Sequence, residues 1–130
     1  MSRKKTILDL YKMKETGEKA AWMVIYDACF AAYAEEAGMD MILCGDSVGM
    51  IVYGFQGTVP VTMDVSIAHT QAVRRGAPNT YLIGDMPFGS YHASCEDAVR
   101  NALRFYKEAD VDAIKLEGVV RVADKIKAIT

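Results

Sequence analysis

The sequence contains MILCGDS at residues 41–47, where an apolar run meets a polar turn. The apolar part does not alternate, which is typical of a short strand buried on both faces of a parallel sheet. Similar β-type runs lie at 21–26, 80–84 and 112–116. The starts of these runs are on average about 30 residues apart, close to the repeat of about 31 residues in a (β/α)8 barrel. The spacing therefore favours successive βα units of such a barrel.

Helical patterns separate the β-type runs, and several of them end in glycine, which suits a helix C-cap. They cover residues 6–14, 28–37, 65–75, 94–106 and 120–129. We expect an α/β fold of the (β/α)8 TIM-barrel type, of which this chain covers about the first four βα units plus an N-terminal helix. Residues 1–130 would form a single domain, the first half of the barrel. A small doubly wound sheet is the alternative, because four or five strands would complete it.

Composition excludes several classes of partner. The 130 residues are 52% hydrophobic and 25% charged, with a net charge of −2, so no basic field is available for nucleic acid. No apolar run approaches the roughly 18 residues of a membrane span. Three widely spaced cysteines, Cys29, Cys44 and Cys95, predict buried thiols in a reducing, cytoplasmic environment.

A carboxylate follows each β-type run: Asp27, Asp46, Asp85 and Glu117. In a parallel barrel these positions converge on the rim where active sites are built. So many carboxylates need a compensating cation, and Lys115 offsets only one of them. Oxygen ligands without Cys or His favour Mg²⁺. Asp27 precedes a helix and fits a cap, whereas loop sequence after Asp46 and Asp85 makes these two the predicted metal ligands.

The segment 45–62 predicts a long functional loop without the glycine spacing of a nucleotide site. His69 lies in a predicted helix and is interpreted as packed or capping. His92 lies in a rim loop, where contact with substrate and simple solvation are equally open. Arg74 stands near a helix end, where it would balance the helix dipole.

Six short motifs along the chain resemble the ketopantoate hydroxymethyltransferase family, in order and at the family's spacing. They are Tyr26-Asp27, Gly45-Asp46-Ser47-Val48-Gly49-Met50, Thr58-Val59-Pro60-Val61-Thr62, His69-Thr70 with Ala72-Val73-Arg74-Arg75-Gly76, Asp85-Met86-Pro87-Phe88 with Ser90-Tyr91, and Lys115-Leu116-Glu117-Gly118. The resemblance implies a (β/α)8 barrel of the phosphoenolpyruvate mutase and isocitrate lyase superfamily.

The resemblance also implies an activity: transfer of a hydroxymethyl group from 5,10-methylenetetrahydrofolate to 2-oxoisovalerate, through a Mg-stabilised enolate, in pantothenate synthesis. Asp46 and Asp85 would bind Mg²⁺ and substrate, Ser47 and Lys115 would contact the 2-oxo acid, and Glu117 would support the metal through its water shell. The family's general-base Glu is expected beyond Thr130. The family further implies a homo-oligomer, a decamer, with the 2-oxo acid and folate as small-molecule partners.

Two other interpretations stay open at this point. A related superfamily lyase that cleaves carbon–carbon bonds in 2-oxo or 2-hydroxy acids would use a similar rim, although its usual Cys-containing catalytic loop is not found. A non-catalytic half-barrel is the second, because four parallel strands leave two edges unpaired.

Overall fold

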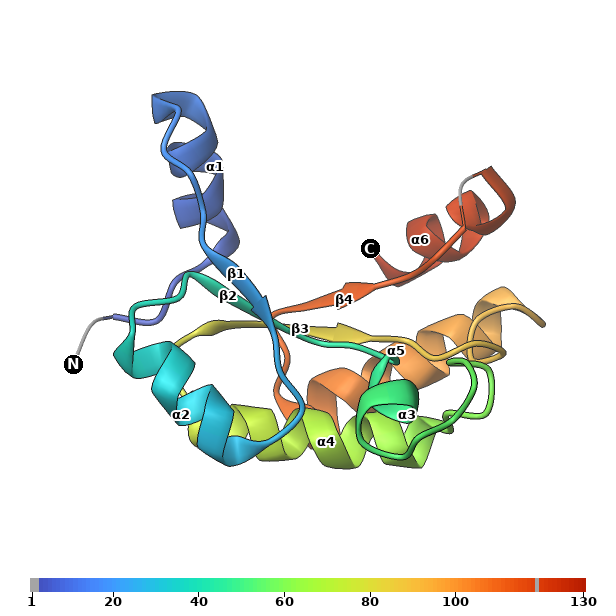
Figure 1. The fold of residues 1–130 in the computed structure, drawn as a ribbon. Helices are drawn as coiled ribbons and strands as arrows, with labels where there is room; N and C mark the ends of the chain where they lie inside the picture. The colour runs from blue at the N-terminus through green and yellow to red at the C-terminus, as the bar shows by residue number, and fades with distance from the viewer. Residues whose placement is uncertain (1–2, 119) are drawn as a thin grey trace.

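Four parallel strands form the central sheet of the computed structural model, which describes residues 3–118 and 120–130 (Figure 1). The strands are β1 (Trp22–Val24), β2 (Met41–Cys44), β3 (Tyr81–Asp85) and β4 (Ala113–Lys115). They lie side by side in chain order, and each pairs in parallel with the next. A doubly wound sheet reverses its strand order at a switch point, and the described strands show no reversal. The order is that of an arc of a (β/α)8 barrel.

Helices connect the strands, as the sequence predicts. They are α1 (Ile7–Thr16), α2 (Ala28–Glu36), α3 (Val48–Ile51), α4 (Met63–Gly76), α5 (Cys95–Ala109) and α6 (Ala123–Ile129), with the 3-10 turn η1 (Val120–Val122) before α6. Figure 1 shows α2, α4 and α5 along one face of the sheet, with α1 projecting from the other side. Within the described residues, no helix is long and apolar enough to cross a membrane.

The helices begin where short polar side chains cap them. Asp27 Oδ1 accepts a hydrogen bond from the Phe30 backbone N–H at 2.9 Å, which confirms its capping role. Thr62 caps α4 and Ser94 caps α5 in the same way. Each cap satisfies a backbone donor that the first helical turn leaves without a partner.

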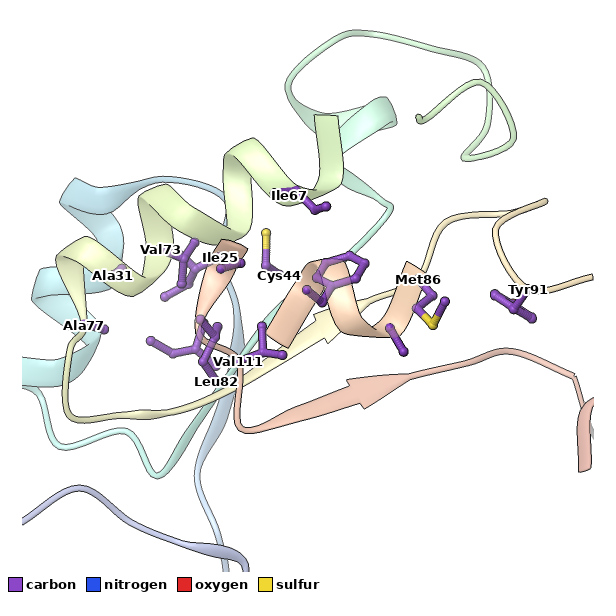
Figure 2. Close-up of a cluster of buried hydrophobic side chains, with 14 of the residues drawn as sticks. Ile25, Ala31, Cys44, Ile67, Val73, Ala77, Leu82, Met86, Tyr91 and Val111 are labelled. Atoms are coloured by element: carbon purple, nitrogen blue, oxygen red, sulfur yellow. The ribbon is translucent and has the colours of Figure 1, made fainter. Parts of the chain in front are cut away.

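The core lies between the sheet and the helices. Figure 2 shows Val73 of α4 near Leu82 of β3, and both side chains are almost fully buried. Phe105 of α5 is fully buried as well. A Cβ added at Gly84 would lie 2.6 Å from Phe105 Cδ1, so only glycine lets α5 pack this closely on β3. Burial of these apolar side chains drives the helices onto one face of the sheet.

The structure corrects three sequence predictions. The predicted loop after Asp46 contains the short helix α3. Cys44 is buried, and burial raises the pKa of its thiol to about 12. Cys29 is exposed and Cys95 is partly exposed, so the prediction of buried thiols is wrong for these two. Arg74 does more than balance a helix dipole, because its guanidinium is buried and bonds to Asp112 and four backbone carbonyls. That arrangement depends on segments distant in sequence.

The outer strand β1 retains exposed apolar side chains. Trp22 and Val24 of β1 are 52% and 46% exposed. Among the described strands, β1 and β4 each pair on one side only. Self-association through such surfaces stays a prediction.

Candidate active site

Three charged side chains meet at the carboxyl end of the sheet, and the backbone of Asp46 joins them. Lys115 Nζ lies 2.8 and 2.9 Å from the two carboxylate oxygens of Asp85 and 2.7 Å from Glu117 Oε1. The backbone N–H of Asp46 donates to Asp85 Oδ2 at 3.1 Å. Three strands thus bring the predicted residues Asp46, Asp85, Lys115 and Glu117 together.

Strand register explains this convergence. Asp85 is the last residue of β3, and Lys115, the last residue of β4, is its direct partner. Side chains two residues apart in extended backbone point to the same face, which places Glu117 on the side of Lys115. Asp46 follows β2 by two residues, so its backbone reaches the end of the neighbouring strand.

Burial sets the charge balance of the cluster. Asp85 is only 2% exposed, and this burial raises the pKa of its carboxyl above the usual value. The hydrogen bond from Lys115 acts against the shift, and the nearby charge of Asp46 adds to it. Burial acts to lower the pKa of Lys115, but the hydrogen bonds to Asp85 and Glu117 outweigh it and raise that pKa. Lys115 therefore stays cationic at neutral pH.

Glycine leaves space beside these groups. A Cβ at Gly45 would lie 2.9 Å from Ser47 Oγ and 3.6 Å from Asp85 Oδ2. The hydroxyls of Ser47 and Tyr26 form a hydrogen bond of 2.7 Å. The site thus combines a glycine without a side chain at 45, the Ser47 hydroxyl held by Tyr26, and the carboxylates of Asp46 and Asp85.

The chemistry of these donors fits Mg²⁺. Mg²⁺ in proteins is commonly held by one or two carboxylates, with water and substrate oxygens as its other ligands. Asp46 and Asp85 supply two such carboxylates. Both carboxylate oxygens of Asp85 already contact a cation, the Lys115 ammonium. In residues 3–118 and 120–130, no group of three or more His, Cys, Asp or Glu side chains could hold a metal ion by itself. The residues fit a metal that is completed by water and substrate.

The two histidines lie outside the charged cluster. His69 Nδ1 is 2.6 Å from the Tyr26 carbonyl oxygen, and its Nε2 is 3.1 Å from the Tyr53 hydroxyl. Since a carbonyl only accepts, Nδ1 donates to the Tyr26 oxygen, and Nε2 shares a hydrogen bond with the Tyr53 hydroxyl. His69 thus links the segment after β1 to the long loop, in agreement with a packed role. His92 accepts a hydrogen bond from the Gly89 N–H through Nδ1.

Two tyrosines at this edge were not identified as site residues from the sequence. Tyr26 contacts Ser47, and the Tyr91 hydroxyl contacts the backbone of Glu117. Both lie in motifs of the family resemblance, and this was the available signal. Nothing in their local sequence indicates which distant backbone or hydroxyl they meet.

Comparison with known proteins adds a decisive observation to this geometry. A profile of the family described as ketopantoate hydroxymethyltransferase matches residues 4–130. The chain belongs to this family. The family resemblance carried by the sequence motifs is confirmed.

Curated relatives carry the name 3-methyl-2-oxobutanoate hydroxymethyltransferase. The relative from Alkaliphilus metalliredigens (strain QYMF) is 66% identical over 130 residues, which are 100% of this chain and 46% of the relative. The relative from Bacillus subtilis (strain 168) is 52% identical over 126 residues, 97% of this chain and 46% of the relative. The chain thus spans about half the length of these relatives, which are named as transferases.

Solved structures support the fold of this family member. A crystal structure of 2,3-dimethylmalate lyase, a PEP mutase/isocitrate lyase superfamily member, matches with a TM-score of 0.68 at 19% identity, covering 93% of this chain and 47% of that one. A phosphonopyruvate hydrolase, in complex with oxalate and Mg²⁺, matches with a TM-score of 0.73 at 15% identity, covering 96% and 47%. The four βα units therefore have the fold of half a TIM barrel.

Proposed function

We propose that this chain supplies the metal and 2-oxo acid side of a hydroxymethyltransferase site, which transfers a one-carbon unit from 5,10-methylenetetrahydrofolate to 3-methyl-2-oxobutanoate. The convergence of Asp46, Asp85 and Lys115 at the carboxyl end of the sheet is the observation that carries the proposal. Membership of the family supports the choice of reaction.

Asp46 and Asp85 would hold Mg²⁺ in this proposal. When bound, Mg²⁺ acts as a Lewis acid toward the negative charge that develops on a 2-oxo acid during loss of the C3 proton. Burial of Asp85 keeps water away from its carboxylate and strengthens its attraction to a cation.

Lys115 and Ser47 would orient the 2-oxo acid. The Lys115 ammonium is cationic and fixed between two carboxylates, so it supplies a directed positive charge for the substrate's developing oxyanion. Tyr26 holds the Ser47 hydroxyl, which reduces the freedom of that group before substrate arrives. Glu117, whose Oε1 is 2.7 Å from Lys115 Nζ, would support the metal through water.

The remaining functional assignments extend this proposal. Residues 1–130 would make up one domain, the first half of the barrel, and the general base and much of the folate surface are proposed to belong to the second half of the barrel. A homo-oligomer acting in the cytoplasm in pantothenate synthesis is the proposed setting, with no nucleic-acid or membrane partner.

Calorimetric titration with Mg²⁺ tests the metal assignment. Asp85→Asn removes the charge with little change in shape, and we expect Mg²⁺ affinity to fall at least about tenfold. Asp27→Asn is the matched control, because it alters another carboxylate that follows a strand but leaves a good helix cap. The control should bind Mg²⁺ like the parent.

Titration with 3-methyl-2-oxobutanoate then tests the substrate assignment. The parent should bind this acid more tightly with Mg²⁺ than without it, and Lys115→Met should weaken binding in both conditions. Equal Mg²⁺ affinity in the parent and Asp85→Asn would refute the metal site. Binding of the acid that is independent of both Mg²⁺ and Lys115 would refute the proposed substrate contacts.

A further inference from the structure

The Tyr91 hydroxyl makes two hydrogen bonds to one residue at the edge of the candidate site. It donates to the Glu117 carbonyl oxygen at 3.1 Å and accepts from the Glu117 backbone N–H at 3.0 Å. A single side chain thus satisfies both backbone groups of a residue that lies beyond the end of a strand.

These bonds continue the order of β4 past its last sheet contact. The last backbone hydrogen bond between the β3 and β4 segments runs from the Met86 N–H to the Lys115 carbonyl at 3.1 Å. Beyond Lys115, the described segment that follows β4 no longer pairs with the segment that follows β3. Among the described residues, the Glu117 backbone has no hydrogen-bond partner other than Tyr91. Gly118, the next residue, has a φ of 120°, a conformation that favours glycine. Tyr91 therefore holds the residue that directly precedes this glycine.

The backbone of Glu117 supports a carboxylate that faces Lys115. Glu117 Oε1 is 2.7 Å from Lys115 Nζ. The Glu117 side chain is otherwise open to solvent, with 66% of it exposed. The hydrogen bonds to the Glu117 backbone therefore fix the position of this residue more than contacts of its side chain do.

We propose that Tyr91 is a positioning residue of the site, which clamps the Glu117 backbone so that the Glu117 carboxylate faces Lys115 and the metal-binding carboxylates. The role toward the metal rests on the proposed function, whereas the clamp itself does not. No contact of Tyr91 with substrate is required.

The surroundings of Tyr91 suit this role. Tyr91 is 2% exposed and belongs to the hydrophobic core. The adjacent Ser90 is anchored by hydrogen bonds to Pro87 and Asn101, so the base of the ring is fixed as well. Burial raises the pKa of the Tyr91 phenol, so the hydroxyl keeps its proton. A protonated hydroxyl can donate one hydrogen bond and accept another at the same time.

Amide hydrogen exchange of Glu117 tests the clamp without any metal. Tyr91→Phe keeps the buried ring and removes only the hydroxyl. We expect the Glu117 amide to exchange about tenfold faster in this variant, the effect of losing one hydrogen bond. Tyr81→Phe is the matched control, because Tyr81 is also a buried tyrosine, at the opposite end of β3, and its hydroxyl contacts Asp112. The control should leave Glu117 exchange unchanged.

Titration with Mn²⁺ alone tests the consequence for the site. Tyr91→Phe should weaken Mn²⁺ binding about tenfold, as loss of support around metal ligands does. In a Glu117→Gln background the same substitution should change affinity by less than about twofold, because Tyr91 acts through Glu117. Tyr81→Phe should bind Mn²⁺ like the parent.

The outcomes separate the clamp from the proposed function. Unchanged Glu117 exchange in Tyr91→Phe would overturn the clamp. Unchanged Mn²⁺ affinity in Tyr91→Phe, or an equal loss in the Glu117→Gln background, would overturn its positioning role. If Asp85→Asn also binds Mn²⁺ like the parent, the metal site itself is wrong, and the exchange result still decides whether the clamp exists.

Discussion

The carboxyl and amino edges of the sheet both carry charged side chains, but the charges have different surroundings. At the carboxyl edge, Lys115 is shared by two carboxylates, and Asp46 has no side-chain partner among the described residues. At the amino edge, Arg74 bonds to Asp112 at 2.6 Å and to four backbone carbonyls. The carboxyl edge leaves the Asp46 carboxylate available to a ligand, whereas the Arg74 guanidinium at the amino edge is occupied by hydrogen bonds within the protein.

Acidic residues at the amino edge are similarly satisfied. The Glu35 carboxylate accepts four hydrogen bonds, two from Asn79 and two from Thr80. Asp40 pairs with Lys5 and accepts from the Ala21 N–H. Such networks fix loops and strand starts, and charges at this end of a barrel generally serve stability, whereas the opposite end serves catalysis. Substitutions at the two edges should therefore affect different measurements.

Arg74→Met should have the largest effect on stability. It removes the donor of several backbone carbonyls and one of the three donors to Asp112, which keeps Lys4 and the Leu82 N–H. Buried acceptors left without a partner cost about 1–3 kcal/mol each, so we expect a loss of about 3 kcal/mol of unfolding free energy. Urea denaturation followed by circular dichroism measures the loss. The neighbouring Arg75 is exposed, so Arg75→Met should cost less than about 0.5 kcal/mol. Equal losses in the two variants would contradict the buried role of Arg74.

Glu35→Gln should have the next largest effect. Glutamine presents an amide donor to groups that themselves donate, and the expected cost is about 1–2 kcal/mol of unfolding free energy. Glu36→Gln, at the adjacent exposed position, is the control and should be near neutral. A near-neutral Glu35→Gln would show that the network contributes little to stability.

The pH dependence of stability sharpens the same point. Burial acts to raise the pKa of Glu35, but hydrogen bonds from Asn79 and Thr80 outweigh it and hold this pKa below its ordinary value of 4.5. A lowered folded-state pKa contributes stability that is complete above the unfolded value and is lost as pH falls through the folded value. Urea midpoints measured from about pH 7 down to about pH 3 should fall in acid, and less steeply in Glu35→Gln. Parallel acid profiles would rule out this contribution.

Asp46→Asn should have the smallest effect on stability. Its carboxylate has no side-chain partner to lose among the described residues, so the unfolding free energy should change by less than about 0.5 kcal/mol. The same variant should weaken Mg²⁺ binding at least about tenfold. A large loss of stability here would mean that the two edges do not divide their roles.

Local patterns in the sequence sufficed for much of the fold. The apolar run 41–44 predicts β2 to the residue, and Ser94 correctly marks the start of α5. These features depend on neighbours in the chain, namely side-chain alternation and short polar caps. The helix α3 was missed because four residues form only one turn, too short for a periodic pattern.

The candidate site divides in the same way. The sequence by itself determined that carboxylates follow the strands and that parallel strands carry them to one edge, because strand direction and alternation are local properties. Only the tertiary structure decided which groups meet. The clamp of Tyr91 on Glu117 and the ion pair of the buried Arg74 with Asp112 join residues far apart in the chain. Their partners are selected by packing of the helices on the sheet, which no local pattern encodes.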